Sequence, residues 1–281
     1  MNLENTPLEL EISDGLELRL SGQPLKPDVR TVRQMLDVVK EKKKVEALAP
    51  ALQSLEQSTY YMYRHVVREE DRQLFEKHKT RYDLTVLPPL KLGSEYNKTY
   101  GHYHQMRDER LSFPELYEVL KGDAQYVLQE RIIGNREKEA GGRGVIAEAE
   151  EGKVGRVFVV HAKAGDKVIV PPNFGHVTVN PSTHPLVMDN LVEAFFQSEY
   201  GAYKKRRGAA VYVTEKGIEE NERYKNHADG GMVIELYAKA FNLMVNPELA
   251  KKLERKKSYE LFLEEPELFR FLREPQEIEL K

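Results

Sequence analysis

Apolar and polar residues alternate along much of the middle of the chain, which is the period-two pattern of β-strands that bury one face. The clearest alternating runs cover residues 81–88, 115–120, 176–180, 186–196 and 209–213. Gly and Pro residues separate many of these runs and mark turns between them. The middle of the chain therefore predicts a mainly β fold.

The N-terminal part combines a hairpin with helices. Residues 7–20 alternate on both sides of Asp14-Gly15, a dipeptide that favours a two-residue hairpin turn. Residues 28–43 carry apolar side chains at helical spacing, and a second helix is expected over residues 45–57, interrupted at Pro50. These elements predict a cover that packs on the sheets.

The C-terminal part has a helical pattern. Val233, Leu236 and Ala240 share one face of an expected helix. Asn246 followed by Pro247 is typical of a helix start, and Pro266 marks another. We expect three parts: an N-terminal hairpin and helix cover (residues 1–57), a β-barrel (residues 58–214) and a C-terminal helical extension (residues 215–281).

Composition narrows the class of protein. The 281 residues include 43 Lys and Arg against 46 Asp and Glu, for a net charge of −3, which argues against nucleic-acid binding as the main function. No apolar run approaches the roughly 18 residues needed to span a bilayer. The first residues lack the pattern of a signal peptide. With no Cys, disulfides and thiolate ligands are excluded. We expect a cytoplasmic protein that binds neither nucleic acid nor membrane.

Two histidines provide the first chemical signal. His102 and His104 are two residues apart, so on a strand both side chains lie on one face and can share a divalent metal. Glu115 and Tyr117 share one face of the next alternating run, and His176 begins another. Three imidazoles and a carboxylate are a plausible ligand set for a transition metal. The pair alone is also typical of two half-exposed strand histidines.

The order of these residues resembles the two-part signature of cupins, small antiparallel β-barrels (jelly rolls) that bind a metal inside. The pattern is His-x-His, a Glu seven positions before Gly122, and later G-x5-P-x4-H-x3-N ending at Asn180. Three or four residues usually separate the second His from the Glu, but ten separate His104 from Glu115, which makes Glu109 a competitor. We choose Glu115 because of its spacing to Gly122 and because Pro114 ends the preceding loop.

Four segments resemble a narrower family, the cupin-type glucose-6-phosphate isomerases. They are TVLPPLKLG (residues 85–93), KTYGHYH (98–104), ELYEVL (115–120) and VPPNFGHVTVN (170–180). The resemblance covers residues 58–214. It implies that the metal ligands are His102, His104, Glu115 and His176. It also implies that Thr85, Thr99 and Gly101 contact the sugar phosphate and that Tyr117 lies in the pocket.

The resemblance implies a metal-dependent isomerase that interconverts glucose 6-phosphate and fructose 6-phosphate in glycolysis and gluconeogenesis. It implies a homodimer with one divalent transition metal per chain, iron first and manganese, zinc or nickel compatible. Glu115 is a candidate base for an enediol route, and a hydride shift would need no base. Two alternatives stay open: a cupin dioxygenase with His- and Glu-ligated iron, and a non-catalytic sugar-binding regulatory cupin.

The chain departs from the family in two places. Residues 105–114 form a longer segment, and Val192 stands where the family has a pocket tyrosine. The longer segment carries Arg107 and Arg110, and we hypothesise that one of them closes over the phosphate, because a guanidinium matches its geometry. The alternative is a solvated loop in which both pair with its own acidic residues.

Other features of the sequence are interpreted as structural. Tyr61 and Tyr63 are expected in the core, with a polar pocket as the alternative. Residues 141–144 are glycine-rich but no helix follows, so we expect a loop rather than a phosphate cradle. The basic run 204–207 is expected to be a solvated turn. The histidines that lack a partner at ligand spacing are His161, His184 and His227.

Overall fold

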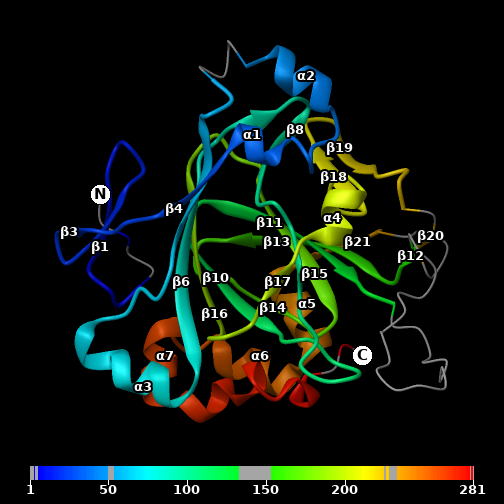
Figure 1. Cartoon of the computed structure of the whole chain (residues 1–281). Coiled ribbons are helices and arrows are strands. Elements are labelled where there is room, and N and C mark those ends of the chain that lie inside the picture. The colour runs from blue at the N-terminus through cyan, green and yellow to red at the C-terminus, as the bar shows by residue number, and fades with distance from the viewer. Residues whose placement is uncertain are drawn as a thin grey trace, which may run out of the picture.

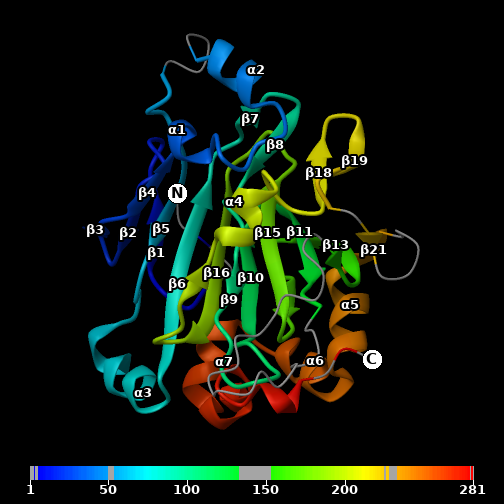
Figure 2. The same cartoon turned by 45° about the vertical axis from the view of Figure 1, so that its right-hand side comes forward.

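Two β-sheets face each other and enclose the middle of the molecule (Figures 1 and 2). In the computed structural model, one sheet has the order β14-β10-β16-β6-β5-β4, and the other has the order β19-β18-β8-β15-β11-β13-β21. Within these two sheets, the described neighbouring strands are antiparallel except β13 and β21, which are parallel. This arrangement confirms the mainly β fold and the jelly-roll barrel.

The structure describes residues 3, 6–49, 54–132, 153–224, 226–227, 233–278 and 280, so the glycine-rich residues 141–144 and the side chain of His227 lie outside the described residues. The first elements are β1 (Leu10–Ile12), β2 (Leu18–Leu20), β3 (Gln23–Pro24), β4 (Asp28–Thr31), α1 (Val32–Met35), α2 (Lys42–Ala47), β5 (Ser58–Tyr63), η1 (Glu69–Asp71), α3 (Arg72–Lys77), β6 (Thr80–Leu87), β7 (Lys91–Leu92), β8 (Glu95–Lys98) and β9 (Tyr103–His104).

The remaining strands are β10 (Glu115–Lys121), β11 (Asp123–Glu130), β12 (Lys153–Val154), β13 (Val157–Lys163), β14 (Lys167–Val170), β15 (Phe174–Asn180), β16 (Leu186–Glu193), β17 (Ser198–Glu199), β18 (Val211–Thr214), β19 (Gly217–Glu220), β20 (Asn226–His227) and β21 (Val233–Tyr237). The remaining helices are α4 (Gly201–Lys205), α5 (Ala238–Val245), α6 (Pro247–Leu253), α7 (Ser258–Glu264), η2 (Pro266–Leu272) and η3 (Pro275–Glu277).

The N-terminal hairpin is confirmed, but within the helix expected over residues 28–43 only Val32–Met35 (α1) and the start of α2 (Lys42–Ala47) are helical. Of the second helix, expected over residues 45–57, only residues 45–47 are helical among the described residues, and Pro50 lies outside them. β1 and β2 pair antiparallel on either side of Asp14-Gly15. Asp28–Thr31 instead forms β4, which pairs with β5 at the edge of the sheet. The helix begins only at Val32, where a capping box at Thr31 satisfies the first free N–H groups. Backbone pairing with β5 therefore overrides the helical spacing.

The helix expected to include Val233 and Leu236 is also wrong at its start. Val233–Tyr237 is a strand that pairs in parallel with β13, and helix α5 begins at Ala238. The later helix starts are confirmed: Asn246 Oδ1 accepts a hydrogen bond from Leu249 N at 3.0 Å, and Pro266 opens a 3-10 helix. The division of the chain at residues 57 and 214 stays a prediction.

The C-terminal helices cover the outer face of the first sheet, at the bottom of Figure 1. The Asn242 side chain on α5 bonds to Ile169 N and Lys167 O of β14, at 3.0 and 2.7 Å. The rings of Tyr259 on α7 and Tyr82 on β6 are 4.9 Å apart. Both faces of this sheet are therefore buried, the inner one by the barrel and the outer one by helices.

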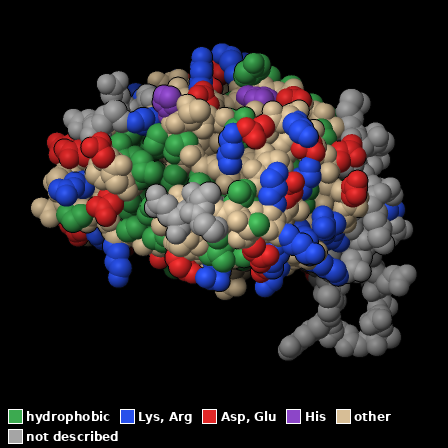
Figure 3. Space-filling view, turned by 90° about the horizontal axis from the view of Figure 1, so that it is seen from above, with side chains coloured by type: hydrophobic (Ala, Val, Ile, Leu, Met, Phe, Trp, Pro, Cys, Tyr) green, Lys and Arg blue, Asp and Glu red, His purple; other side chains and the backbone are tan. Residues whose placement is uncertain are grey.

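The surface carries charges of both signs. Figure 3 shows Lys and Arg side chains interspersed with Asp and Glu side chains on the face seen from above. In the described part of the chain, no helix has both the length and the apolar character needed to cross a membrane.

Candidate metal centre

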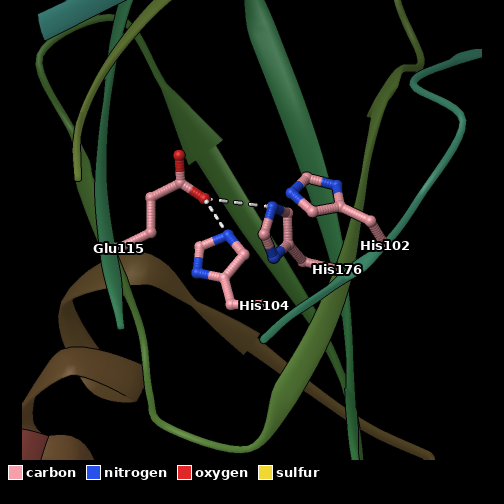
Figure 4. A group of neighbouring side chains, drawn as sticks. All are labelled: His102, His104, Glu115 and His176. Carbon is pink, nitrogen blue, oxygen red and sulfur yellow. Dashed lines mark ion pairs between the residues drawn. The ribbon is translucent and has the colours of Figure 1, made fainter. Parts of the chain in front are cut away.

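Four side chains converge inside the barrel. One ligand atom from each of His102, His104, Glu115 and His176 lies within 4.8 Å of the others. Figure 4 shows the Glu115 carboxylate turned toward His104 and His176, with His102 on the far side of His176. The structure therefore brings together all four residues expected from the sequence.

Backbone pairing places these side chains. His102 lies just before β9 and pairs with His176 on β15, with N–H to O distances of 3.3 and 3.0 Å in the two directions. Glu115 begins β10, whose next inward residue is Tyr117. Because residues two apart on a strand share a face, His102 and His104 both point inward.

The tautomer of His104 is fixed by its neighbour. His104 Nδ1 lies 2.8 Å from Phe113 O, and a carbonyl oxygen can only accept, so Nδ1–H donates to it. His104 Nε2 then carries a lone pair directed at Glu115 Oε2, which is 3.2 Å away. This is the arrangement by which proteins orient an imidazole toward a metal.

His176 makes the other close contacts within the group, and the Tyr117 hydroxyl can donate to it. His176 Nε2 lies 3.2 Å from the same Glu115 oxygen and 3.1 Å from the Tyr117 hydroxyl. Three buried atoms, His104 Nε2, Glu115 Oε2 and His176 Nδ1, have no hydrogen-bond partner among the described residues. Buried lone pairs that converge without donors need a cation. Imidazole and carboxylate groups are ligands that first-row transition metals accept, so the residues fit such an ion.

Protonation favours the same interpretation. Burial would raise the pKa of Glu115, but the contacts with His104 and His176 hold it well below its usual range. Burial, followed by the neighbouring His176 and His104, holds the pKa of His102 well below its ordinary value. Burial also lowers the pKa of His176. An ionised carboxylate beside neutral imidazoles is the state in which these groups bind metal.

The structure places Glu115, and not Glu109, with the histidines. Glu109 is exposed in a short loop closed by the bridge between Met106 and Ser112. A backbone bond from Arg107 N to Leu111 O, 2.8 Å long, closes this loop on itself. The additional residues after His104 therefore leave the barrel as a small hairpin.

A cavity adjoins the group and includes the other residues singled out in the sequence. Thr85, Thr99, Gly101 and Tyr117 line it, together with His102 and Glu115. Gly101 has φ +83°, and a Cβ there would lie 2.5 Å from Val177 Cγ2, so only glycine fits at this position. Val192 is fully buried opposite Glu115 and does not line the cavity.

The arginines of the long loop do not reach this cavity. Arg107 and Arg110 are exposed and neither lines it. Arg107 Nη1 lies 3.4 Å from Asp108 Oδ2, and Asp108 Oδ1 accepts a bond from Arg110 N at 2.8 Å. The structure agrees with the alternative of a solvated loop.

Two other arginines, which the sequence analysis did not single out, lie at the cavity. Arg64 lines it, and the guanidinium carbon of Arg30 is 5.3 Å from the centre of the Tyr100 ring, which also lines it. Tyr60 lines the cavity, whereas neither Tyr61 nor Tyr63 does. Residues 60, 62 and 64 share one face of a strand, but the residues between them are no more apolar, so the sequence carries no signal for this face.

The remaining basic and histidine residues have structural neighbours. His161 Nε2 lies 3.1 Å from Glu235 Oε2, and His184 Nδ1 lies 3.1 Å from Thr183 Oγ1. In the basic run 204–207, Lys204 lies on helix α4, and its Nζ is 3.3 Å from Asp37 Oδ2. Among the described residues, these histidines do not join the metal-type cluster.

The amino-acid sequence is similar to those of known glucose-6-phosphate isomerases. Residues 29–229 match the family model described as "Glucose-6-phosphate isomerase (GPI)". The curated glucose-6-phosphate isomerase of Pyrococcus horikoshii is 26% identical over 176 residues, which cover 58% of this chain and 79% of that protein. The glucose-6-phosphate isomerase of Thermococcus gammatolerans is 29% identical over 143 residues, covering 50% of this chain and 62% of that protein.

Solved structures overlap with the chain less closely. Oxalate decarboxylase from Bacillus subtilis covers 48% of this chain at 16% identity, with a TM-score of 0.29, and the match spans 25% of that chain. The family assignment therefore rests on the sequence comparisons.

Proposed function

Because the chain belongs to the glucose-6-phosphate isomerase family, we propose that it interconverts glucose 6-phosphate and fructose 6-phosphate at the metal centre described above. The observation that carries the proposal is the convergence of three imidazoles and one carboxylate, with orphaned lone pairs, beside a polar cavity. The aligned regions span between 62% and 79% of the curated relatives' lengths in the two comparisons above.

The four converging side chains would hold one divalent metal, and iron is proposed first, with manganese, zinc and nickel compatible. When bound, such an ion supplies Lewis-acid stabilisation of the charge that builds on the C1 and C2 oxygens of the sugar. The protein contributes the orientation of His104 through Phe113 O and the lowered pKa values of His102 and His176.

Glu115 is the proposed base if the reaction passes through an enediol. Its carboxylate is buried and ionised and it lines the cavity. A base would carry the proton between C1 and C2 and exchange part of it with water. A direct hydride shift would retain the hydrogen, so loss of a C2 deuterium label to water distinguishes the two routes.

The phosphate is proposed to lie at the end of the cavity formed by Thr85, Thr99 and Gly101. Tyr60 stands there too: its hydroxyl oxygen accepts bonds from Tyr100 N at 3.2 Å and Arg30 Nε at 3.3 Å. That oxygen then has its own proton left to donate to an anion.

Arg30 adds charge at this end, because it has no carboxylate partner among the described residues. Removing a hydrogen bond to a charged group costs about 1.5–3 kcal/mol, so Arg30→Ala should raise KM for fructose 6-phosphate roughly 10- to 150-fold. Arg107→Ala is the matched control and should keep the parent KM. An unchanged KM for Arg30→Ala at low salt would assign the phosphate to other groups.

Several further expectations belong to this proposal: a homodimer, a cytoplasmic location and a place in glycolysis and gluconeogenesis. Light scattering of the purified protein tests the dimer. The cupin dioxygenase and the non-catalytic sugar-binding alternatives are separated by one assay, in which fructose 6-phosphate and dissolved O2 are followed together. The proposal expects turnover of the sugar without O2 consumption.

A further inference from the structure

A row of polar side chains crosses the inner wall of the barrel beside the metal centre. Tyr117 on β10 is paired with Asn190 on β16, and Asn190 is paired with Asp83 on β6. Arg64, just past the end of β5, continues the row through its contact with Asp83. Arg64, Asn190 and Tyr117 line the same cavity as Glu115.

Asp83 holds Arg64 in place. The Asp83 side chain is fully buried, and its Oδ2 accepts bonds from Arg64 Nη1 at 2.7 Å and Arg81 Nε at 2.8 Å. Its Oδ1 accepts a bond from His65 N at 3.0 Å. Two guanidinium groups share one carboxylate, so these three side chains together have a net charge of about +1.

The excess charge is presented to the cavity by Arg64 and not by Arg81. Arg81 stacks its guanidinium 5.2 Å from the Phe196 ring centre, and its Nη1 lies 3.4 Å from Ala194 O. Among the described residues, Arg64 Nη2 has a hydrogen bond only to the weakly accepting sulfur of Met62, at 3.3 Å. The Arg64 side chain is 39% exposed, although the carboxylate that orients it is buried.

The position of Arg64 determines which part of a bound sugar phosphate lies next to it. Tyr60, at the proposed phosphate end, and Arg64 are four residues apart, about 13 Å in an extended strand. Arg64 lies instead in the row that leads to Tyr117, whose hydroxyl contacts His176. A sugar phosphate with its phosphate near Tyr60 would therefore bring its reacting carbons toward Arg64.

We propose that Arg64, oriented by Asp83, is a catalytic residue that donates hydrogen bonds to the substrate oxygens at C1 or C2, where negative charge develops. This inference rests on the proposed function. A donor fixed in advance costs no reorganisation when charge appears, and removal of one such donor typically lowers kcat by about 10²- to 10³-fold. The competing explanation is that Arg64 only neutralises the buried Asp83.

The test uses the metal-loaded full chain and four variants. Arg64→Gln removes the charge, and Arg64→Lys retains it without the planar fork. Asp83→Asn with Arg64→Gln returns this part of the wall to the net charge of the parent, with Arg81 as the remaining cation. Arg107→Gln, on the exposed loop, is the control. We expect kcat to fall about 10²- to 10³-fold in Arg64→Gln with KM for fructose 6-phosphate changed far less. We expect partial recovery in Arg64→Lys, and none in the double variant.

A binding measurement accompanies the kinetics. A phosphorylated five-carbon sugar acid presents a carboxylate where the substrate develops charge, so calorimetry should show weaker binding to Arg64→Gln than to the parent. Binding of the matching sugar alcohol phosphate, which lacks the carboxylate, should stay unchanged. Each protein's metal content is measured in parallel.

The outcomes separate the two proposals. An active parent together with an Arg64→Gln variant of similar kcat, or a double variant that regains activity, overturns the role of Arg64 and leaves the isomerase function standing. A metal-loaded parent that does not isomerise the sugar phosphate overturns the proposed function, and with it the role of Arg64.

Discussion

Strand β10 carries buried carboxylates on both of its faces, and the two faces differ in what surrounds the charge. Glu115 faces the cavity with the three histidines. Glu118 faces outward beneath helix α7, and both carboxylates are at most 2% exposed. Two buried glutamates on one strand therefore lie in two different environments.

The outer group contains its own cation, Lys167, although Glu118 Oε1, Asp189 Oδ1 and Ser258 Oγ also lack a hydrogen bond among the described residues. Lys167 Nζ lies 3.2 Å from Glu118 Oε1, and Ser258 N donates to Glu118 Oε2 at 2.6 Å. The hydroxyl of Tyr82 donates to Asp189 Oδ2 at 2.7 Å. Burial, and then the adjacent Glu118, raise the pKa of Asp189 well above its usual range, so a proton satisfies this carboxyl. These contacts connect β6, β10, β14, β16 and α7.

The inner group lacks such partners. His104 and His176 direct nitrogen atoms at one oxygen of Glu115, and the described residues supply neither a cation nor a donor for three of the buried atoms. Burial of charge alone therefore does not mark a functional site. Buried atoms without a hydrogen bond occur in both groups, and the inner one differs in that its acceptors converge with no cation beside them among the described residues, whereas Lys167 lies beside Glu118.

The largest effect is expected from removing a ligand of the inner group. His176→Ala should lower metal affinity by more than the roughly 10- to 100-fold typical when only an outer hydrogen-bond partner is lost, and isomerase activity should disappear with the metal. His161→Ala is the control, and elemental analysis of the purified variants is the measurement. Equal metal content in both variants would break the distinction between the groups.

The same measurement settles the choice between the two glutamates. Glu115→Ala should lose most bound metal, whereas Glu109→Ala, in the exposed loop, should retain it. The reverse result would show that the loop rearranges to bring Glu109 into the barrel.

Removal of Glu118 should affect stability instead. Glu118→Ala leaves Lys167 buried without its carboxylate, and breaking such a pair costs about 3–5 kcal/mol. Urea unfolding of the parent and the variant measures this loss, and the metal content of the folded fraction should equal that of the parent. A variant that unfolds like the parent but loses its metal would exchange the roles of the two faces.

The smallest effect concerns pH. Because the folded pKa of Asp189 is raised, the folded state binds its proton more tightly than the unfolded chain does. This contribution to stability is present at acid pH and is lost as pH rises from the usual carboxyl range through the folded pKa. Asp189→Asn carries no such proton, so its free energy of unfolding relative to the parent should increase with pH. A difference that falls as pH rises would contradict the protonated state of Asp189.

The metal group was predictable from sequence because its signals are local or tied to turns. Glu115 was chosen over Glu109 partly through Gly122, and the structure gives that glycine φ +85° with Pro185 O 2.9 Å from where a Cβ would stand. A glycine is therefore required at that position for steric reasons, and its spacing to the glutamate carries information.

Contacts between distant strands were not predictable. Arg64 and Asp83 pair across two strands, and a sequence alone shows neither the register nor which way each side chain turns. For Val233–Tyr237, the same apolar positions fit a helix face or a strand, and only the edge of β13 decides the outcome. The partner of a segment, and not its own pattern, settled these cases.

Metal content and activity measured on the same protein test the central claim most directly. We predict close to one transition-metal ion per chain, isomerisation of fructose 6-phosphate without O2 consumption, loss of that activity after chelation, and its return when iron or another compatible divalent ion is added. A metal-free protein with full isomerase activity, or activity that survives chelation with the metal gone, would contradict the account.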